Sequence, residues 1–378
     1  MRLLFVASLH HPQALEDARR AAPPGEDPLF PPSQAQHFWV KALRRQGHAC
    51  AVFWRSASAL PWARTRQLRM TQRLTPARAI SALAGRVPAL NPDIRLRNRR
   101  LIAAAAQFQP DAIILIGDNR VILPETLARL KRELGAALVY ASGTSPVVFS
   151  HAIERAAAPL VDLAVTNDFY HAIQWRELGA RRAEALPLAA IDPEFHHPYT
   201  LSEDERARYS CDVGFVGTLV PPRLYGERIA ALESLRDFDL GIWSVHEVPP
   251  SLRRFYRGSA LGAEMLRATG AGKIALNPHG DFMRWGGNMR LFEACGVGAF
   301  QLVDDRPGVR AWFRDGEHLV IYRDHEHLRA LARYYLAHDD ERRQIADAGR
   351  AHALAHHTYD QRMARLIDLI IEIGANRQ

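Results

Sequence analysis

Several common sequence signals are absent from this chain of 378 residues. Its three cysteines (Cys50, Cys211 and Cys295) are widely spaced and odd in number, and none belongs to a C-x-x-C pair. These features argue against a disulfide framework, favour a reducing compartment and leave a structural zinc ion without its usual ligands. No stretch approaches the roughly 20 apolar residues of a membrane-spanning helix. We therefore expect a cytoplasmic protein.

The usual signatures of dinucleotide and mononucleotide sites are missing as well. The segments that follow the first expected strand of each half, Ser8–Pro12 and Gly214–Thr218, lack the G-x-G-x-x-G spacing, and G-x-x-x-x-G-K-[ST] does not occur. The histidine pairs and His325-Glu326-His327 lack the H-E-x-x-H spacing, so we expect no metal site. Met1–Leu9 is apolar but carries a single arginine, and we expect a first β-strand there and not a signal peptide.

Positive charge is present in excess, and it is concentrated in one segment. Residues 55–100 contain eleven arginines and one acid, Asp93, which gives this segment a charge of +10 in a chain of net charge +8. Its apolar residues recur at a loose helical spacing. One interpretation is an interfacial helix that docks on anionic lipid or on a polyanionic acceptor, and the other is a solvated arginine-rich face. Because few stacking aromatics accompany the arginines, we expect no nucleic-acid partner.

The first half of the chain alternates strand and helix patterns. Apolar runs predict strands over residues 2–7, 49–54, 111–116, 136–141, 162–166 and 183–188. Helices are predicted over residues 33–47, with Ser33 as the N-cap, and over 124–134 and 170–178. This β-α rhythm is typical of a mostly parallel sheet with helices on both faces.

The rhythm breaks at the proline-rich and charged segment 187–209 and then starts again. Strands are predicted over residues 212–216, 238–243, 273–276, 298–303 and 318–322, and three closing helices over 326–337, 340–355 and 359–373. The sequence therefore predicts two α/β sheets with a cleft between them.

The most informative stretch is Lys273–Phe300. A buried strand leads into a polar, glycine-rich loop (Asn277–Gly287), after which Asn288 can cap a helix. Such a loop presents backbone N–H groups and a helix dipole to phosphate. Glu293 lies on the same helix, where a carboxylate can bind a ribose diol. Arg223 and Lys273 are available to neutralise a diphosphate.

Three motifs in this half resemble a known family: N-x-R-x-F-E at Asn288–Glu293, G-x-F-Q-L-V-D-D-R-P-G and D-G-E-H-L-V-I-Y. They are similar to the C-terminal domain of group-1 glycosyltransferases, and most of all to the CgeB-like branch. The resemblance covers residues 212–370, and in the first half it rests on architecture and on Leu186–Phe195. It implies a GT-B fold, in which two Rossmann-like, doubly wound parallel-sheet domains face an interdomain cleft and helices close the chain. It also implies a hexosyltransferase that uses a nucleoside-diphosphate sugar, of the UDP or GDP type, and no metal.

The resemblance and the residues together predict the donor site. It comprises Gly217, Thr218, Arg223, Lys273, Asn277, His279, Asn288, Arg290 and Glu293. Glu293 matches the family's ribose-binding carboxylate. Many members carry E-x7-E, with the earlier acid on the donor sugar, but Trp285 stands at that position here. How this chain would hold the sugar is therefore open.

The catalytic base is predicted less directly. His11 and Asp118 each follow an expected strand end, where either side chain could deprotonate an acceptor hydroxyl. The alternative is that these loops are polar because they are loops. In a retaining reaction the leaving phosphate could take the proton, and no base would be needed.

The expected domains are an acceptor domain (residues 1–190, with the basic insert 55–100), a linker (191–210) and a donor domain (211–355). A last helix (356–378) would cross back to the first domain. We expect a lipid-linked or anionic acceptor, with the insert in peripheral contact with the inner face of the membrane. Two alternatives stay open: a nucleotide-sugar epimerase of the same fold, and a non-catalytic coat or scaffold protein that retains it.

Overall fold

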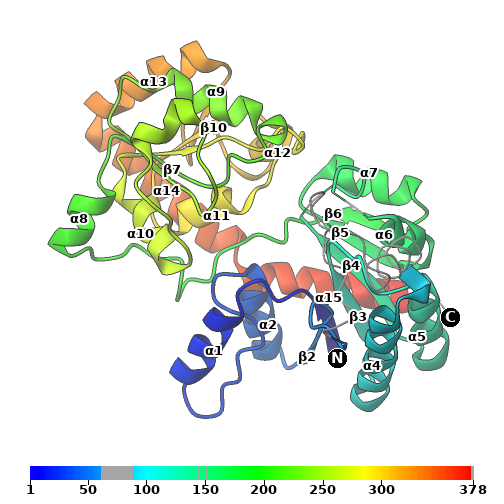
Figure 1. Ribbon diagram of the computed structural model, residues 1–378. Coiled ribbons are helices and arrows are strands. Elements are labelled where there is room, and N and C mark those ends of the chain that lie inside the picture. The colour runs from blue at the N-terminus through cyan, green and yellow to red at the C-terminus, as the bar shows by residue number, and fades with distance from the viewer. Residues whose placement is uncertain (61–87, 144, 150, 376–378) are drawn as a thin grey trace, which may run out of the picture.

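The computed structural model describes residues 1–60, 88–143, 145–149 and 151–375 (Figure 1). It contains two parallel β-sheets, each covered by helices on both faces, so the prediction of two α/β domains is confirmed. Within these residues the N-terminal sheet has six strands and the C-terminal sheet has five.

The N-terminal sheet has the strand order β2-β1-β3-β4-β5-β6, and every neighbouring pair is parallel. The strands are β1 (Arg2–Ala7), β2 (Ala49–Trp54), β3 (Ala112–Ile116), β4 (Ala137–Ser142), β5 (Leu163–Thr166) and β6 (Ala183–Ala185). The helices are α1 (Pro12–Ala21), α2 (Ala35–Arg45), α4 (Pro92–Phe108), α5 (Pro124–Leu134), α6 (Ala152–Ala157) and α7 (Phe169–Glu177). Successive strand residues face opposite sides, so Leu3 and Phe5 pack on the side of α2 and Leu4 and Val6 on the side of α4 and α5.

The C-terminal sheet has the order β11-β10-β9-β7-β8 and is also parallel. Its strands are β7 (Val213–Val216), β8 (Leu240–Trp243), β9 (Ile274–Asn277), β10 (Gln301–Asp304) and β11 (Val320–Tyr322). Its helices are α8 (Glu203–Tyr209), α9 (Gly226–Ser234), α10 (Ala263–Ala271), α11 (Met289–Gly296), α12 (Pro307–Trp312), α13 (His325–Ala337) and α14 (Asp339–His356). In each sheet the chain winds away in both directions from the two central strands, β1 and β3 or β7 and β9. Ligands of doubly wound sheets bind at the carboxyl ends of such strands.

The last helix, α15 (Tyr359–Ala375), packs on the N-terminal domain although it follows the C-terminal one (Figure 1). Tyr359 is fully buried and stacks on Phe38 of α2 with 5.4 Å between the ring centroids. Arg45 of α2 forms an ion pair with Asp360 at 2.8 Å. The C-terminal helix therefore joins the two domains by a second connection.

Some sequence predictions were wrong in detail. Gln34, and not Ser33, is the N-cap of α2, because the Gln34 N–H bonds to the Pro31 carbonyl and places Ser33 inside a turn. The predicted strand 183–188 ends at Ala185, two residues before Pro187. The charged run assigned to the linker forms α8, which a capping box between Ser202 and Glu205 initiates.

Only the ends of the basic insert belong to the described residues, and the amphipathic pattern within 61–87 lies outside them. The described arginines are partly internal. Arg55 is buried, and Arg97 pairs with the buried Asp93 at the start of α4. In the part of the chain that the structure describes, no helix has the length and apolar character needed to cross a bilayer.

His357 lies buried between α14 and α15, where the chain crosses between the domains. The Nη2 of Arg362 donates to its Nδ1 at 2.8 Å, so the ring proton belongs on Nε2, which lies 3.3 Å from the carbonyl oxygen of Trp312. Burial first, and Arg362 second, lower the pKa of His357 to about 3. The ring is therefore neutral in the folded protein.

This neutral histidine should make the fold sensitive to acid. The unfolded chain binds a proton at this ring below about pH 6.5, whereas the folded chain does so only near pH 3, so stability falls as the pH drops through this window. We expect His357→Gln, whose amide can keep both hydrogen bonds, to lose up to about 1.4 kcal/mol less per pH unit than the wild type. Urea unfolding between about pH 7 and pH 4.5 measures the difference. The exposed His11→Gln serves as the control, and identical pH slopes for wild type and His357→Gln would contradict the prediction.

Candidate functional site

Two cavities adjoin each other between the domains, at the carboxyl ends of both sheets. One has a volume of about 180 Å³ and is lined by Glu293 and Arg290 of α11; we call it the Glu293 cavity. The other has a volume of about 250 Å³, is lined by Asp118 after β3, and is called the Asp118 cavity. Ala35 of α2 and Met289 of α11 line both, and Figure 1 shows α11 on the side of its domain that faces α2. The two cavities therefore form one interdomain cleft.

The Glu293 cavity combines a buried acid with unpartnered polar atoms. Glu293 is only 5% exposed; its Oε2 is in close contact with Arg290 Nη1, and its Oε1 lies 4.0 Å from His196 Nε2. Burial lowers the pKa of His196, so that ring is neutral at pH 7. Among the described residues, Arg290 Nε and Ser33 Oγ are buried without a hydrogen-bond partner, and both residues line this cavity. Buried polar atoms of this kind favour a polar ligand.

Asparagine side chains fix the start of α11. Asn288 is the N-cap, as predicted, and its Oδ1 accepts the Leu291 N–H at 2.9 Å. Its Nδ2 donates to Oδ1 of Asn277, the last residue of β9, at 2.8 Å. The end of the strand and the start of the helix are thereby held together, and Asn277 itself is buried behind the cleft.

His279 supports the loop from inside and has no exposed surface. Its Nδ1 lies 2.6 Å from Asp304 Oδ1 at the end of β10, and its Nε2 accepts the Gly287 N–H at 3.1 Å. Burial alone would raise the pKa of Asp304, but His279 and Arg306 outweigh it and lower this pKa to about 2. His279 therefore shapes the loop Asn277–Gly287, with both ring nitrogens already engaged.

The turn after β7 is held by an arginine that the sequence analysis missed. Arg228 on α9 donates from Nη1 to the Thr218 carbonyl at 2.8 Å and from Nε to the Pro278 carbonyl at 3.1 Å. It thus ties together the loops that follow the two central strands, β7 and β9. Burial lowers the pKa of Arg228, which has no ion pair with any described carboxylate. In the sequence, Arg228 stands in the first turn of the helix that follows Gly217-Thr218, and this place could have identified it.

The remaining predicted cations are not brought to the cleft. Arg223 is exposed on a short 3-10 helix after a proline pair. Lys273 precedes β9 and pairs with Asp212 at 2.9 Å, at the amino edge of the sheet and so opposite the cleft. Gly217, Thr218, Asn277, Asn288, Arg290 and Glu293 gather at the carboxyl edge, and Lys273 does not join them.

On the N-terminal wall, Asp118 occupies an unusual backbone conformation. Its φ of 57° lies in the left-handed region, and its carboxylate pairs with Arg120 at 2.8 Å. The Asn119 side chain fixes the turn by accepting the Ile122 N–H at 2.9 Å, and buried Glu154 accepts the Asn119 N–H at 2.6 Å. Among the described residues that line the Asp118 cavity, Asp118 is the only ionisable one. His11 is exposed at the start of α1 and lines neither cavity of the cleft.

The N-terminal sheet repeats the arginine arrangement of the C-terminal one. Arg55 follows β2, and its guanidinium is in close contact with the Gly117 carbonyl after β3 and lies 3.5 Å from the Val6 carbonyl on β1. Its Nε donates to Ser8 Oγ at 3.1 Å. Burial lowers the pKa of Arg55 as it does that of Arg228. In both sheets a buried guanidinium therefore closes the gap between the central strands.

The glycine-rich loop Asn277–Gly287 is anchored directly to the N-terminal domain. Buried Asp168, after β5, accepts the Tyr170 N–H with Oδ1 and the Trp285 N–H of the other domain with Oδ2, each at 2.8 Å. His171 Nε2 lies 3.3 Å from the Phe282 carbonyl. The Trp285 ring packs 5.2 Å from Phe169 in a separate cavity of about 370 Å³. Trp285, eight residues before Glu293, thus serves in contact between the domains.

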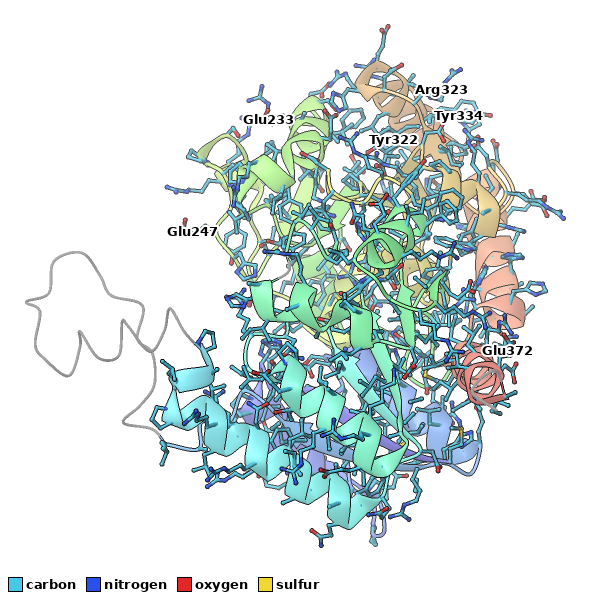
Figure 2. The ribbon with its side chains drawn as sticks, turned by 90° about the vertical axis from the view of Figure 1, so that its right-hand side faces the viewer. Glu233, Glu247, Tyr322, Arg323, Tyr334 and Glu372 are labelled. Atoms are coloured by element: carbon cyan, nitrogen blue, oxygen red, sulfur yellow. The ribbon has the colours of Figure 1, made fainter. Side chains whose placement is uncertain are left out.

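Another cavity, of about 480 Å³, lies at the far end of the C-terminal carboxyl edge, beside Tyr322 and Arg323 (Figure 2). Many of its charged side chains are already engaged. Arg306 pairs with Asp304, and Asp324 accepts the His327 N–H as the N-cap of α13. None of the described residues with an unpartnered buried polar atom lines this cavity, whereas Ser33 and Arg290 line the Glu293 cavity. We therefore place the candidate site in the cleft.

Gly287 gives a test of the interdomain anchor. Its φ is +101°, and a Cβ there would lie 2.6 Å from Trp312 and 2.9 Å from the Asn167 carbonyl oxygen of the other domain. We expect Gly287→Ala to lower the free energy of unfolding by about 1–3 kcal/mol more than Gly25→Ala does. Gly25 is the matched control, because its φ is +92° with no atom within 4 Å of the added Cβ. Urea unfolding compares the two, and equal losses would show that backbone strain alone matters.

Comparisons with known proteins concern the fold of the chain and its C-terminal half. Residues 227–368 match a protein family described as glycosyl transferase-like. HepE from Anabaena in complex with UDP-glucose has 14% sequence identity and a TM-score of 0.59, with 97% of this chain and 99% of that chain covered. Sucrose-phosphate synthase from Thermosynechococcus elongatus has 12% identity and a TM-score of 0.62, with 100% of both chains covered.

A third structure, trehalose-6-phosphate from E. coli bound with UDP-2-fluoro glucose, has 14% identity and a TM-score of 0.59, with 98% of this chain and 99% of that chain covered. No curated protein sequence matches this chain. At these identities the structural neighbours establish the fold, and the family match covers the domain that carries α11 and Glu293. The chain therefore has the GT-B fold and carries a glycosyl transferase-like domain over residues 227–368.

Proposed function

We propose that this protein is a hexosyltransferase that moves a sugar from a nucleoside-diphosphate sugar to an acceptor hydroxyl, without a metal ion. One observation carries the proposal. The cleft places buried Glu293 beside the unpartnered Nε of Arg290 on the C-terminal side, and Asp118 is the one carboxylate among the described lining residues on the N-terminal side; Ala35 and Met289 join the two parts. A donor pocket that adjoins an acceptor pocket is what a two-substrate transfer needs.

In this proposal Glu293 binds the ribose of the donor. Its carboxylate lines the cavity, and Arg290 holds it in place through the close contact described above. A diol accepted by a carboxylate gives two charge-assisted hydrogen bonds. The donor is of the UDP type, by analogy with HepE in complex with UDP-glucose. The motif over Asn288–Glu293 supports placing the chain in the CgeB-like branch.

The diphosphate would lie at the start of α11. The first-turn N–H groups of that helix and the Arg290 guanidinium can offset its charge, since Arg290 Nε has no other partner among the described residues. Gly217 and Thr218, held by Arg228, form the opposite side of the crevice. These fixed dipoles and the cation stabilise the departing diphosphate, which is the usual main source of rate in such transfers.

Asp118 is the base in this proposal. The acceptor oxygen bonds to the sugar C1 while the bond from C1 to the β-phosphate oxygen breaks, and the hydroxyl proton passes to the Asp118 carboxylate. The electron pair of the broken bond leaves with the diphosphate. His11 is the weaker candidate, because it lines neither cavity of the cleft.

The donor site is tested with Glu293→Gln and a panel of UDP, GDP, dTDP, ADP and CDP. We expect one diphosphate to bind the wild type and to lose about 10- to 100-fold in affinity in the variant, because two charge-assisted bonds become neutral. Isothermal titration calorimetry gives the dissociation constants. Glu247→Gln, which changes an exposed carboxylate of the same domain (Figure 2), should bind as the wild type does. An unchanged affinity in Glu293→Gln would remove the ribose assignment, and no binding by the wild type would favour the scaffold alternative.

Asp118→Asn tests the base. Asparagine tolerates the left-handed backbone of this position, so the variant removes only the charge. We expect kcat to fall by about 10²- to 10⁴-fold with the donor affinity unchanged. Arg120→Gln, which removes the ion pair but keeps the carboxylate, is the matched control and should keep kcat within about threefold. A kcat near the wild-type value in Asp118→Asn would assign the proton to another acceptor, such as the leaving phosphate.

A further inference from the structure

We propose that the acceptor is a neutral molecule with an apolar ring, which presents one hydroxyl to Asp118. This inference rests on the proposed function, because it names the substrate class of the Asp118 cavity. It differs from the anionic acceptor expected from the arginine-rich segment, most of which lies outside the described residues. The support comes from the walls of the cavity, their hydrogen bonds and their charge.

The walls that face the cavity are mainly apolar. Trp39 and Ala35 of α2 form one side, Ile116 at the end of β3 and Leu188 after β6 form another, and Met289 closes the cavity from the C-terminal domain. At about 250 Å³, the space suits a compact ring and not an extended chain. Burial of apolar surface against these side chains would supply the affinity.

Two polar atoms of the wall are already used within the protein. The Trp39 indole N–H donates to the Leu188 carbonyl at 2.9 Å, and Asn167 Oδ1 accepts the Leu188 N–H at 2.8 Å. A sugar ring would bring several hydroxyl groups into this space, and each one left without a partner costs roughly 1–3 kcal/mol. A molecule with a single hydroxyl avoids this cost, and Asp118 supplies its acceptor.

The charge of the cavity points the same way. Asp118 is the only ionisable residue among its described lining residues, and Arg120 is paired with that carboxylate at 2.8 Å. A phosphorylated acceptor would place a dianion near this carboxylate without a cation of its own. The Asp118 side chain is 54% exposed, and repulsion between a phosphate and this carboxylate, with no cation among the described lining residues to offset it, favours a neutral acceptor.

The first experiment measures binding of three probes to the full chain saturated with the diphosphate that the panel selects. The probes are 4-methylumbelliferone, glucose and glucose 6-phosphate, and saturation-transfer NMR gives their affinities. We expect 4-methylumbelliferone to bind at least tenfold more tightly than either sugar. Equal or tighter binding of glucose 6-phosphate, or no binding of 4-methylumbelliferone at millimolar concentration, would overturn the inference.

A matched pair of variants tests whether the cavity is the place of discrimination. Gln36 is half-buried on α2 and lines the Asp118 cavity. Gln36→Lys should raise the affinity for glucose 6-phosphate at least tenfold relative to Gln36→Met, which has a similar length and no charge. Equal affinities in the two variants would place the phosphate elsewhere and overturn the charge argument. Nucleotide binding separates the two levels: if the diphosphate binds but the probes fail, only the acceptor class is wrong, whereas loss of nucleotide binding in the wild type removes the proposed function itself.

Discussion

The cleft of this protein depends on the carboxylate of Asp168, which binds backbone N–H groups of both domains at once. One oxygen caps α7 in its own domain, and the other accepts the Trp285 N–H of the loop Asn277–Gly287. Because the carboxylate is fully buried, both bonds form away from water, where an unpaired partner would be costly. The loop so anchored leads into α11, so the place of Glu293 relative to the N-terminal wall follows from this contact. Helix α15 reinforces the same arrangement from the opposite side of the N-terminal sheet.

Each domain also has a buried arginine between the two central strands of its sheet. In a doubly wound sheet the loops after the two central strands diverge, and the crevice between them exposes carbonyl groups. The guanidinium groups of Arg55 and Arg228 donate hydrogen bonds to these carbonyls. Burial lowers the pKa of both arginines, and neither forms an ion pair with a carboxylate among the described residues. The crevice edges are thereby fixed before any ligand binds. A preorganised site of this kind needs less reorganisation during a reaction.

Trp285 stands where many members of the resembled family carry an acid, and in this structure it contacts the N-terminal domain. In sequence the residue occupies the place of a sugar-binding acid, yet its N–H anchors the loop to Asp168 and its ring packs against Phe169. The loop Asn277–Gly287 therefore uses Trp285 for a contact between the domains. The cleft is left with Glu293 and Arg290 on one wall and Asp118 on the other as its principal charges.

Local sequence patterns were enough to predict the alternation of strands and helices, because buried parallel strands such as Ala112–Ile116 are continuous apolar runs and glycines mark the helix ends at Gly135 and Gly179. They also predicted the Asn288 cap and the helix that carries Glu293, since capping is a local interaction. The sequence analysis did not predict α8, whose charged residues resemble a linker until the Ser202–Glu205 capping box is considered. Which polar residues meet follows from the folded arrangement of the domains: Lys273 lies at the amino edge of the sheet, opposite the cleft, His279 turns inward, and Arg228 and Asp168 take central places. These outcomes depend on contacts between residues far apart in the chain, such as Asp168 with Trp285, and no local pattern encodes such a distance.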